Sequence, residues 1–283
     1  MSWAHDMFKF LRPVREDKVY HYTTLSALKA ILETQSLHLS HILCSNDYTE
    51  FENGIRFFWD EWLVSAEKER KFIDVIGGIK RCGELKDASL YARKKTNCCF
   101  LSCCFGKKSD DLLNQWRVYA QDGFGVAIGF DTKVMEDVCR INGFFLGECL
   151  YRKDDKNQAC DTLAEQLQKE LNNEHFKSLL LIYTTILGLF FKNECFKEEQ
   201  EARIATYPKI ALDIKERANR LVAFYCLDIK EKMTNLIKEV VIGPCHVDRY
   251  DETHKMVEVL LQKAGIGNCA IRKSVIPYRS YKI

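Results

Sequence analysis

The stretch "VYHYTTLSALKAILETQSLHLSH" (residues 19–41) carries three secondary-structure patterns in direct succession. Residues 18–23 alternate as the side chains of a β-strand do. Thr24 can cap a helix, and residues 25–32 place three leucines and an isoleucine on one stripe at helical spacing. Residues 36–41 alternate again and predict a second strand. The protein is therefore expected to combine a sheet with helices.

The rest of the chain continues this mixture. Strands are predicted where apolar or alternating runs end at turn residues, namely at 98–105, 124–131, 200–206, 239–244 and 268–276. Helices are predicted at 52–82, 110–123, over most of 155–196, and at 248–265. The final strand, helix and strand have the order of a β-α-β unit.

The predicted fold class is α+β, with a mixed sheet surrounded by helices. No linker or repeat divides the sequence, so residues 1–283 are expected to form a single composite domain. Its parts are an N-terminal sheet with helices (18–131), a helical insertion (155–196), and C-terminal strands with a helix (197–283).

Composition limits the class of protein. Of the 283 residues 47% are hydrophobic and 29% charged, which is typical of a globular chain. A net charge of +2 provides no basic field for nucleic acid or an anionic membrane. The apolar run at 179–191 is too short to span a bilayer, so we expect a buried helix and no membrane partner. The N-terminal residues lack the apolar stretch of a signal peptide, which favours a cytoplasmic protein.

The chain contains thirteen cysteines. In a reducing compartment they are expected to be free thiols that pack mostly as small core residues. The pairs at 98–99 and 103–104 do not have C-x-x-C spacing, and that spacing occurs nowhere else. No zinc site is therefore predicted.

Two candidate sites lie near the N-terminus. In a strand, His21 and Thr23 share a face while Tyr22 points the other way, so an imidazole and a hydroxyl could both hydrogen-bond to a sugar diol. The alternative is an ordinary strand end with a satisfied histidine. Asn46 and Asp47, followed by Glu50, could hold ligand hydroxyls from a loop, or could simply form a turn.

A third candidate lies in the predicted helix at 110–123. Trp116 and Tyr119 are three residues apart and share a helix face, with Arg117 beside them. Aromatic rings next to a guanidinium suit a planar, anionic nucleotide. The same residues also suit a helix that packs on the sheet and leaves its arginine in water.

The fourth candidate is the run Glu199-Gln200-Glu201-Ala202-Arg203. In a strand, Glu199, Glu201 and Arg203 fall on one face, and the arginine keeps a neighbouring carboxylate ionised. A fixed negative charge is what a reaction through an oxocarbenium-like transition state requires. The alternative is a solvated edge strand whose charges prevent aggregation.

Several segments together resemble the bacterial domain-of-unknown-function family 2971, whose name implies no activity. They are "HYTTLSALKAIL", "SNDYTEFENG", "FLSCCF…DDLLNQWRVYAQDGFGVAIGFD", "FKEEQEARI" and "VVIGP…IPYR". They occur in family order and extend over nearly the whole chain.

A more distant resemblance is to the ADP-ribosyltransferase fold. The opening strand, helix and strand with its H-x-T resemble the start of that fold, and Glu199-Gln200-Glu201 resembles its late E-x-E. The resemblance implies that His21 contacts a ribose of NAD, that Glu201 stabilises the cation formed as nicotinamide leaves, and that Glu199 orients or deprotonates the acceptor. Trp116 or Tyr119 would supply the stacking aromatic.

This resemblance implies an enzyme that cleaves NAD by transfer of ADP-ribose to an intracellular macromolecule or to water, as toxins and phage-defence effectors do. NAD would be a substrate, and no metal is implied. The implied catalytic residues are Glu201 and Glu199. The implied NAD-binding residues are His21, Tyr22, Thr23, Asn46, Asp47, Trp116, Arg117, Tyr119 and Arg203.

Two alternatives to this enzyme stay open. One is a non-enzymatic module that binds a nucleotide or a partner in the same cleft through its arginines and aromatic residues. The other is a metal-dependent nuclease that uses Asp47, Glu50 and Glu199, although the near-neutral net charge does not favour attraction of phosphate.

Overall fold

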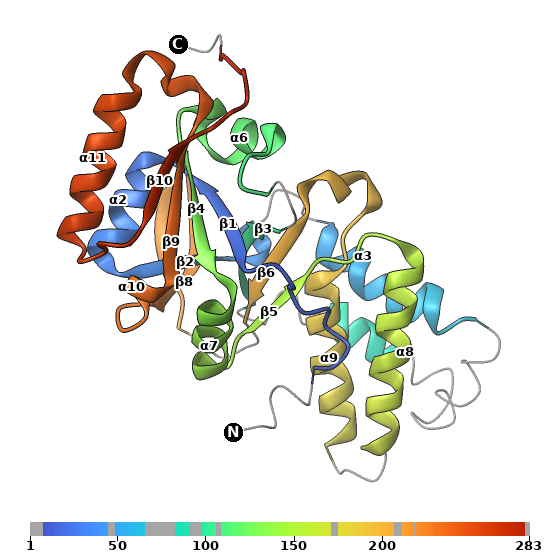
Figure 1. The fold of residues 1–283 in the computed structure, drawn as a ribbon. Helices are drawn as coiled ribbons and strands as arrows, with labels where there is room; N and C mark the ends of the chain where they lie inside the picture. Colours follow the sequence, from blue (N-terminus) through green and yellow to red (C-terminus); the bar gives the residue numbers. More distant parts are fainter. Residues whose placement is uncertain are drawn as a thin grey trace.

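A computed structural model describes residues 8–44, 49–65, 83–90, 98–105, 109–170, 175–206, 211–217 and 219–280. Within them a single mixed sheet organises the fold (Figure 1). Its strands are β1 (Lys18–Thr23), β2 (Ser36–His41), β3 (Cys99–Cys104), β4 (Val126–Asp131), β5 (Phe145–Glu148), β6 (Glu201–Ala205), β7 (Asp213–Arg217), β8 (Arg220–Asp228), β9 (Ile237–Ile242) and β10 (Ala270–Lys273).

Strand β3 is the branch point of the sheet. The main path runs β10-β9-β4-β1-β3-β2-β8-β7, while β6 also pairs with β3, and β5 pairs with β6. Among the strand pairs of the described residues, β9 and β10 are parallel, as a β-α-β unit requires, and the others are antiparallel. The sheet is therefore open and mixed, and β6 is placed against a strand that is central to the fold.

One face of the sheet is covered by three helices whose apolar stripes form a common core with it. They are α2 (Leu25–Thr34), α7 (Thr132–Asn142) and α11 (Tyr250–Lys263). The Thr24 hydroxyl caps α2 by accepting from the backbone N–H of Ala27 at 3.0 Å, as a threonine at this position can do. Helix α6 (Leu113–Tyr119) packs on the opposite face through Trp116, against Tyr20 and Tyr22.

A second core lies where four helical segments meet β5 and β6. These are α3 (Glu50–Arg56), the π-helix η2 (Phe57–Trp62), α8 (Lys153–Lys169) and α9 (Phe176–Phe190), of which α8 and α9 lie side by side (Figure 1). Helices α3 and α9 touch through glycines: a Cβ on Gly54 would lie 2.6 Å from the carbonyl oxygen of Gly188. The helices can approach this closely because Gly54 has no side chain.

The remaining helical elements are short. They are the helix α10 (Met233–Leu236), the helical residues 83–90, and the 3₁₀ segments η1 (Ile42–Cys44), η3 (Gln121–Gly123), η4 (Glu194–Glu199) and η5 (Pro244–Arg249). Of these, η4 has no buried residue and leads directly into β6.

Most element types predicted from the sequence are confirmed. Strands form at 18–23, 99–104, 126–131 and 201–205 of one sheet, and the α+β class with its terminal β-α-β unit is as expected. The helix predicted at 52–82 begins at Glu50 and becomes a π-helix at Phe57, and its part after residue 65 lies outside the described residues. The helix predicted at 110–123 is shorter, because α6 ends at Tyr119 and a 3₁₀ turn follows.

One prediction about β6 is wrong. Glu199 is not in the strand; it ends η4, and Gln200 has a left-handed backbone (φ 45°) before β6 starts at Glu201. The left-handed residue breaks the alternation that would have placed Glu199 and Glu201 on one strand face. The hairpin of β7 and β8 and the helix α7 were not predicted at all.

Twelve of the thirteen cysteines lie in the described part of the chain, and none of these twelve forms a disulfide. Seven are buried, as predicted for core thiols: Cys98, Cys99, Cys103, Cys104, Cys139, Cys149 and Cys160. Burial raises the pKa of the Cys139 thiol, so this group stays protonated and packs as a small apolar side chain.

Candidate functional site

Strand β6 points two charged side chains into the protein interior. Glu201 and Arg203 lie opposite Cys104 and Ser102 of β3 and share one face of the sheet. The Arg203 guanidinium donates to both carboxylate oxygens of Glu201, from Nε at 2.7 Å and from a terminal nitrogen at 3.0 Å. Only 2% of Glu201 and 3% of Arg203 is exposed, so this two-point ion pair is shielded from water.

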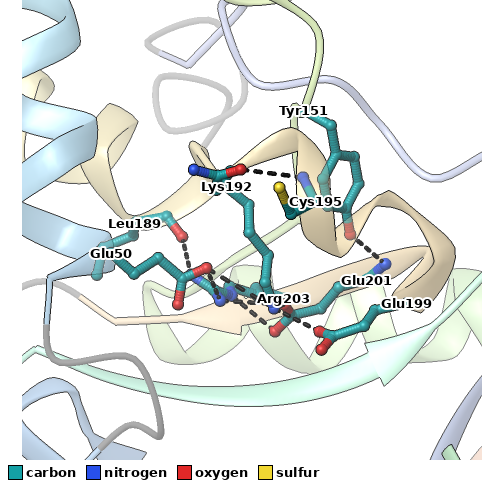
Figure 2. Close-up of polar contacts among 9 residues, drawn as sticks. Glu50, Tyr151, Leu189, Lys192, Cys195, Glu199, Glu201 and Arg203 are labelled. Atoms are coloured by element: carbon teal, nitrogen blue, oxygen red, sulfur yellow. Dashed lines mark hydrogen bonds and ion pairs between the residues drawn. The ribbon is translucent and has the colours of Figure 1, made fainter. Parts of the chain in front are cut away.

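Three further charged residues complete a buried ionic network around this pair. Arg203 also donates to the Glu50 carboxylate at 2.8 Å and to the Leu189 carbonyl at 2.6 Å. The Lys192 ammonium donates to the carboxylates of Glu199 and Glu201 and lies 3.7 Å from that of Glu50. Figure 2 shows the three carboxylates converging on Arg203 and Lys192.

The ionic network contains three carboxyl groups and two cations, so full ionisation would leave one excess negative charge. Burial opposes ionisation of Glu201, but Arg203 and Lys192 outweigh it and hold the pKa of Glu201 at about 2. For Glu50, burial prevails over the attraction of Arg203 and Lys192, and its pKa is raised. Of the two carboxyl groups of Glu50 and Glu201, that of Glu50 therefore keeps a proton more readily.

The Glu201 carboxylate is enclosed by its own partners. Both of its oxygens accept from Arg203 or Lys192, and its backbone N–H donates to the Tyr151 hydroxyl at 2.8 Å. The network joins β6 to the neighbouring segment η4, to the end of α9, and to α3, which lies far earlier in the sequence. In this arrangement Glu201 connects elements of the fold and does not face solvent.

The structure does not bring His21 and Glu201 together. Tyr20 and Glu201 both lie opposite Cys104, so they share a face, and the neighbouring His21 points to the other face with Thr23. The Nδ1 of His21 lies 2.9 Å from the Ser102 carbonyl oxygen, which can only accept a hydrogen bond, so Nδ1 carries the proton. Burial lowers the pKa of this imidazole.

Of the other predicted aromatic and charged residues, some lie at α6 away from the ionic network and one lies close to it. Trp116 is fully buried and donates from Nε1 to Asp111 at 2.7 Å, while its ring meets that of Tyr22 edge to face at 4.8 Å. Arg117 lies on the surface, 4.0 Å from Asp122. These three residues therefore pack and position α6, and they do not join the ionic network.

Tyr119, in contrast, lies close to the network. Helix α6 contacts η4, where the Asn114 side chain donates to the Glu198 carbonyl at 3.1 Å. Burial, with a smaller effect of the negative charges of Glu199 and Glu201, raises the pKa of Tyr119 to about 12. Of the predicted stacking residues, Tyr119 is thus the one that approaches the E-x-E segment. Asn46 and Asp47 lie outside the described residues.

A cleft of about 490 Å³ lies beside the ionic network. Its walls come from α3, η2, α8 and the segment 191–193, and Glu50 and Lys192 belong both to the cleft and to the network. The Lys156 ammonium lies 5.4 Å from the ring centre of Phe57 and 5.8 Å from that of Phe191. Among the described residues no carboxylate is within ion-pair distance of Lys156.

Sequence reasoning missed Lys156 and Lys192 altogether. Lys156 has no local signal, because it lies among other charged residues at the start of α8. Lys192 does have one, since it directly follows the longest apolar run of the chain. A lysine next to a segment that must be buried needs a partner for its charge, and the glutamates at 199 and 201 were available nearby.

Two further kinds of feature are absent from the described part of the chain. No cluster of three or more histidine, cysteine, aspartate or glutamate side chains there is arranged to hold a metal ion. No helix in the same residues is both long and apolar enough to cross a membrane.

Comparisons with known proteins give one match. Neither the curated proteins nor the solved structures contain a significant match to this chain. A family model described as "Protein of unknown function (DUF2971)" matches residues 115–204, a segment that includes Lys156, Lys192, Glu201 and Arg203. The predicted resemblance to DUF2971 is therefore confirmed over these residues, and the family description assigns them no activity.

Proposed function

We propose that the protein binds a small organic anion with a planar ring, such as a nucleotide, in the cleft lined by Phe57, Lys156 and Phe191. The volume of about 490 Å³ is within the range of roughly 300–1,000 Å³ that is usual for small-molecule sites. Besides three carboxylates and the paired cations Arg56 and Lys192, the cleft offers two aromatic rings, the Lys156 ammonium, and the side-chain amides of Asn53 and Asn193. These groups match the ring, the charge and the polar atoms of such a ligand.

The observation that carries this proposal is the unpaired charge of Lys156. Arg56 also lines the cleft, but it is paired with Glu52 at 2.7 Å and with Asp60 at 3.8 Å. Lys192 is held by the carboxylates of the ionic network. In the described lining, Lys156 is thus the cation that can accept an anionic ligand without first losing a carboxylate partner. A partly buried cation with no carboxylate within ion-pair distance among the described residues is a reason to expect a negative group in the ligand.

The proposal is tested by isothermal titration of AMP, ADP, NAD and inorganic phosphate into the wild-type protein, Lys156→Ala and Lys153→Ala. Lys153 is the matched control: it lies in the same helix, three residues earlier, and is exposed and paired with Glu61 at 3.4 Å. Loss of one charge-assisted contact should weaken nucleotide binding by roughly ten- to a hundredfold in Lys156→Ala. Lys153→Ala should bind like wild type. Equal affinity of the two variants, or no binding by wild type, would contradict the proposal.

A second candidate function is NAD cleavage by a fold like that of the ADP-ribosyltransferases. One observation favours it: the Glu199-Gln200-Glu201 segment lies at the junction of η4 and β6, close to Tyr119. It requires that Glu201 separates from Arg203 and Lys192 before it can face a ribose. Binding of a nucleotide needs no such rearrangement, which is why binding is the first proposal.

A further inference from the structure

Strand β7 is the last strand at one end of the main sheet. It pairs with β8 along its inner edge, and in the described part of the chain no strand pairs with its outer edge. The strand carries an apolar side chain that faces water, since 67% of Ile214 is exposed. An open edge presents N–H and C=O groups to which another strand can bond, so β7 is a place where a second chain can extend the sheet.

The hairpin of β7 and β8 determines which backbone groups of β7 point outward. Residues that flank a two-residue hairpin turn exchange backbone hydrogen bonds, and Arg217 and Arg220 are that flanking pair. Hydrogen-bonded pairs recur at every second position, so Lys215 also directs its N–H and C=O toward β8. Ile214 and Glu216 lie at the alternate positions and direct their N–H and C=O toward the outer edge.

We infer that the outer edge of β7 pairs antiparallel with β7 of a second copy of this chain, about a two-fold axis at Ile214. The backbone of Ile214 faces outward, so two copies of this residue can exchange two hydrogen bonds across the axis. The result is one sheet that continues through both copies, with the two β7 strands at its centre.

The charges of β7 select this register. A two-fold pairing centred on Asp213, Lys215 or Glu216 would place two identical charges directly opposite each other, which destabilises a sheet. The pairing centred on Ile214 instead places isoleucine opposite isoleucine. It also places Asp213 of each copy opposite Lys215 of the other, on the second face of the sheet. In this register the strand is complementary to itself in charge and in apolar contact.

The two charged residues of this contact have suitable surroundings. Asp213 is exposed and has no hydrogen-bond or ion-pair partner among the described residues. The Lys215 ammonium lies 4.6 Å from the ring centre of Phe224 and 2.9 Å from Nδ1 of His38. Neither of these two contacts supplies a negative charge, so Asp213 of the second copy offers Lys215 a counter-charge. The flexible lysine side chain turns from the ring toward the strand edge to reach it.

The experiment is size-exclusion chromatography with light scattering of the full chain over a series of concentrations. We expect the mass of wild type to rise toward that of two chains as the concentration increases. Ile214→Lys places two lysines at the axis and removes the apolar contact, so it should weaken dimerisation about tenfold or more. Leu221→Lys is the matched control. Leu221 is 75% exposed on the same face of the hairpin, but it lies in β8, behind β7. This variant should dimerise like wild type.

A charge exchange tests the register. Asp213→Lys places like charges opposite each other at two symmetric positions and should weaken dimerisation about tenfold. Adding Lys215→Asp to this variant restores opposite charges and should restore the dimer. A wild-type mass of one chain at every concentration would overturn the inference. So would equal dimerisation of Ile214→Lys and Leu221→Lys, or a double variant that dimerises no better than Asp213→Lys.

Discussion

Glu201 and His21 point from opposite faces of one sheet, although only strand β3 lies between their strands. Each residue has its own partners: Glu201 is enclosed by Arg203 and Lys192, and His21 is bonded to the Ser102 carbonyl. A ligand that touched both side chains would have to pass through the sheet. The two residues on which the resemblance to an NAD site depends are therefore separated by the backbone of the sheet.

The first prediction concerns NAD. Because the Glu201 carboxylate is ion-paired and 2% exposed, we expect wild-type protein to bind nucleotides without releasing nicotinamide from NAD. Nicotinamide is measured chromatographically, with and without cell extract as a source of acceptor. Release that falls about a hundredfold in Glu201→Gln would instead establish NAD cleavage, since a preorganised charge typically contributes that factor.

The second prediction concerns the stability of the ionic network. Glu201→Gln keeps the shape of the side chain but leaves Arg203 and Lys192 without their closest buried counter-charge. Breaking a buried ion pair in this way should lower the free energy of unfolding by about 3 kcal/mol. The quantity is measured by urea denaturation. Glu198→Gln is the control, because Glu198 has an exposed side chain next to the network, and we expect no more than a small change there.

If both variants were equally stable, the network would contribute nothing to folding. In that case a buried charge at Glu201 would have no structural purpose, and a role in binding or chemistry would be favoured.

The third prediction is a pH dependence that arises at Glu148. Burial, opposed by Arg12, raises the pKa of this carboxyl from 4.5 to about 7. A group with a raised folded-state pKa stabilises the protein fully below its unfolded pKa, and this contribution is lost as the pH rises through the folded pKa. The free energy of unfolding should therefore fall between pH 4.5 and pH 7.

Glu148→Gln removes this titration and provides its test. The variant should show a flatter dependence of unfolding free energy on pH over that interval, as measured by urea denaturation in a series of buffers. An unchanged slope would mean that another group is responsible.

The fourth prediction concerns the contact between α3 and α9. A Cβ at Gly54 would lie 2.6 Å from the Gly188 carbonyl oxygen, so Gly54→Ala must push two helices apart. We expect a loss of about 2 kcal/mol in unfolding free energy despite the better helix propensity of alanine. Gly267→Ala is the control, since no atom lies within 4 Å of the Cβ that it would add. Thermal or urea unfolding of both variants makes the comparison.

Because α3 carries Glu50, the same variant also reports on the site. Displacement of α3 should weaken the contact between Glu50 and Arg203, now 2.8 Å. Nucleotide binding that survives Gly54→Ala unchanged would show that the cleft does not depend on the position of α3.

Local periodicity was enough to predict most of the elements. The strand and helix patterns at 18–41 correspond to β1, α2 and β2, and the last β-α-β unit was also expected. These elements can be predicted because alternation and helical spacing are patterns of nearby residues. Each pattern shows which side chains share the buried face of a strand or of a helix. The left-handed backbone of Gln200, which interrupts the strand pattern, could not be predicted, because only a glycine would have signalled such a conformation in the sequence.

The ionic network was decided by tertiary structure. Arg203 and Glu50 are 153 residues apart in the chain, and the sequence suggests for Glu50 a turn, a ligand-holding loop or a metal-dependent site, but no ion pair with Arg203. The alternation of charged residues shows that Glu201 and Arg203 share one face of a strand. It does not show whether that face is exposed to water or buried in the core. This face is buried because β6 pairs with β3 and because α3 and α9 pack over it.

The H-x-T and E-x-E motifs are a second case in which the sequence shows the residues but not their arrangement in space. Each motif is determined by adjacent residues, and the sequence by itself established that both are present. Whether they form one site depends on the register of β1 and β6 on the strand between them. A shift of one residue in either register would exchange the faces, because side chains alternate along a strand. Register is fixed by contacts between distant segments, so only the folded structure could place His21 and Glu201 on opposite faces.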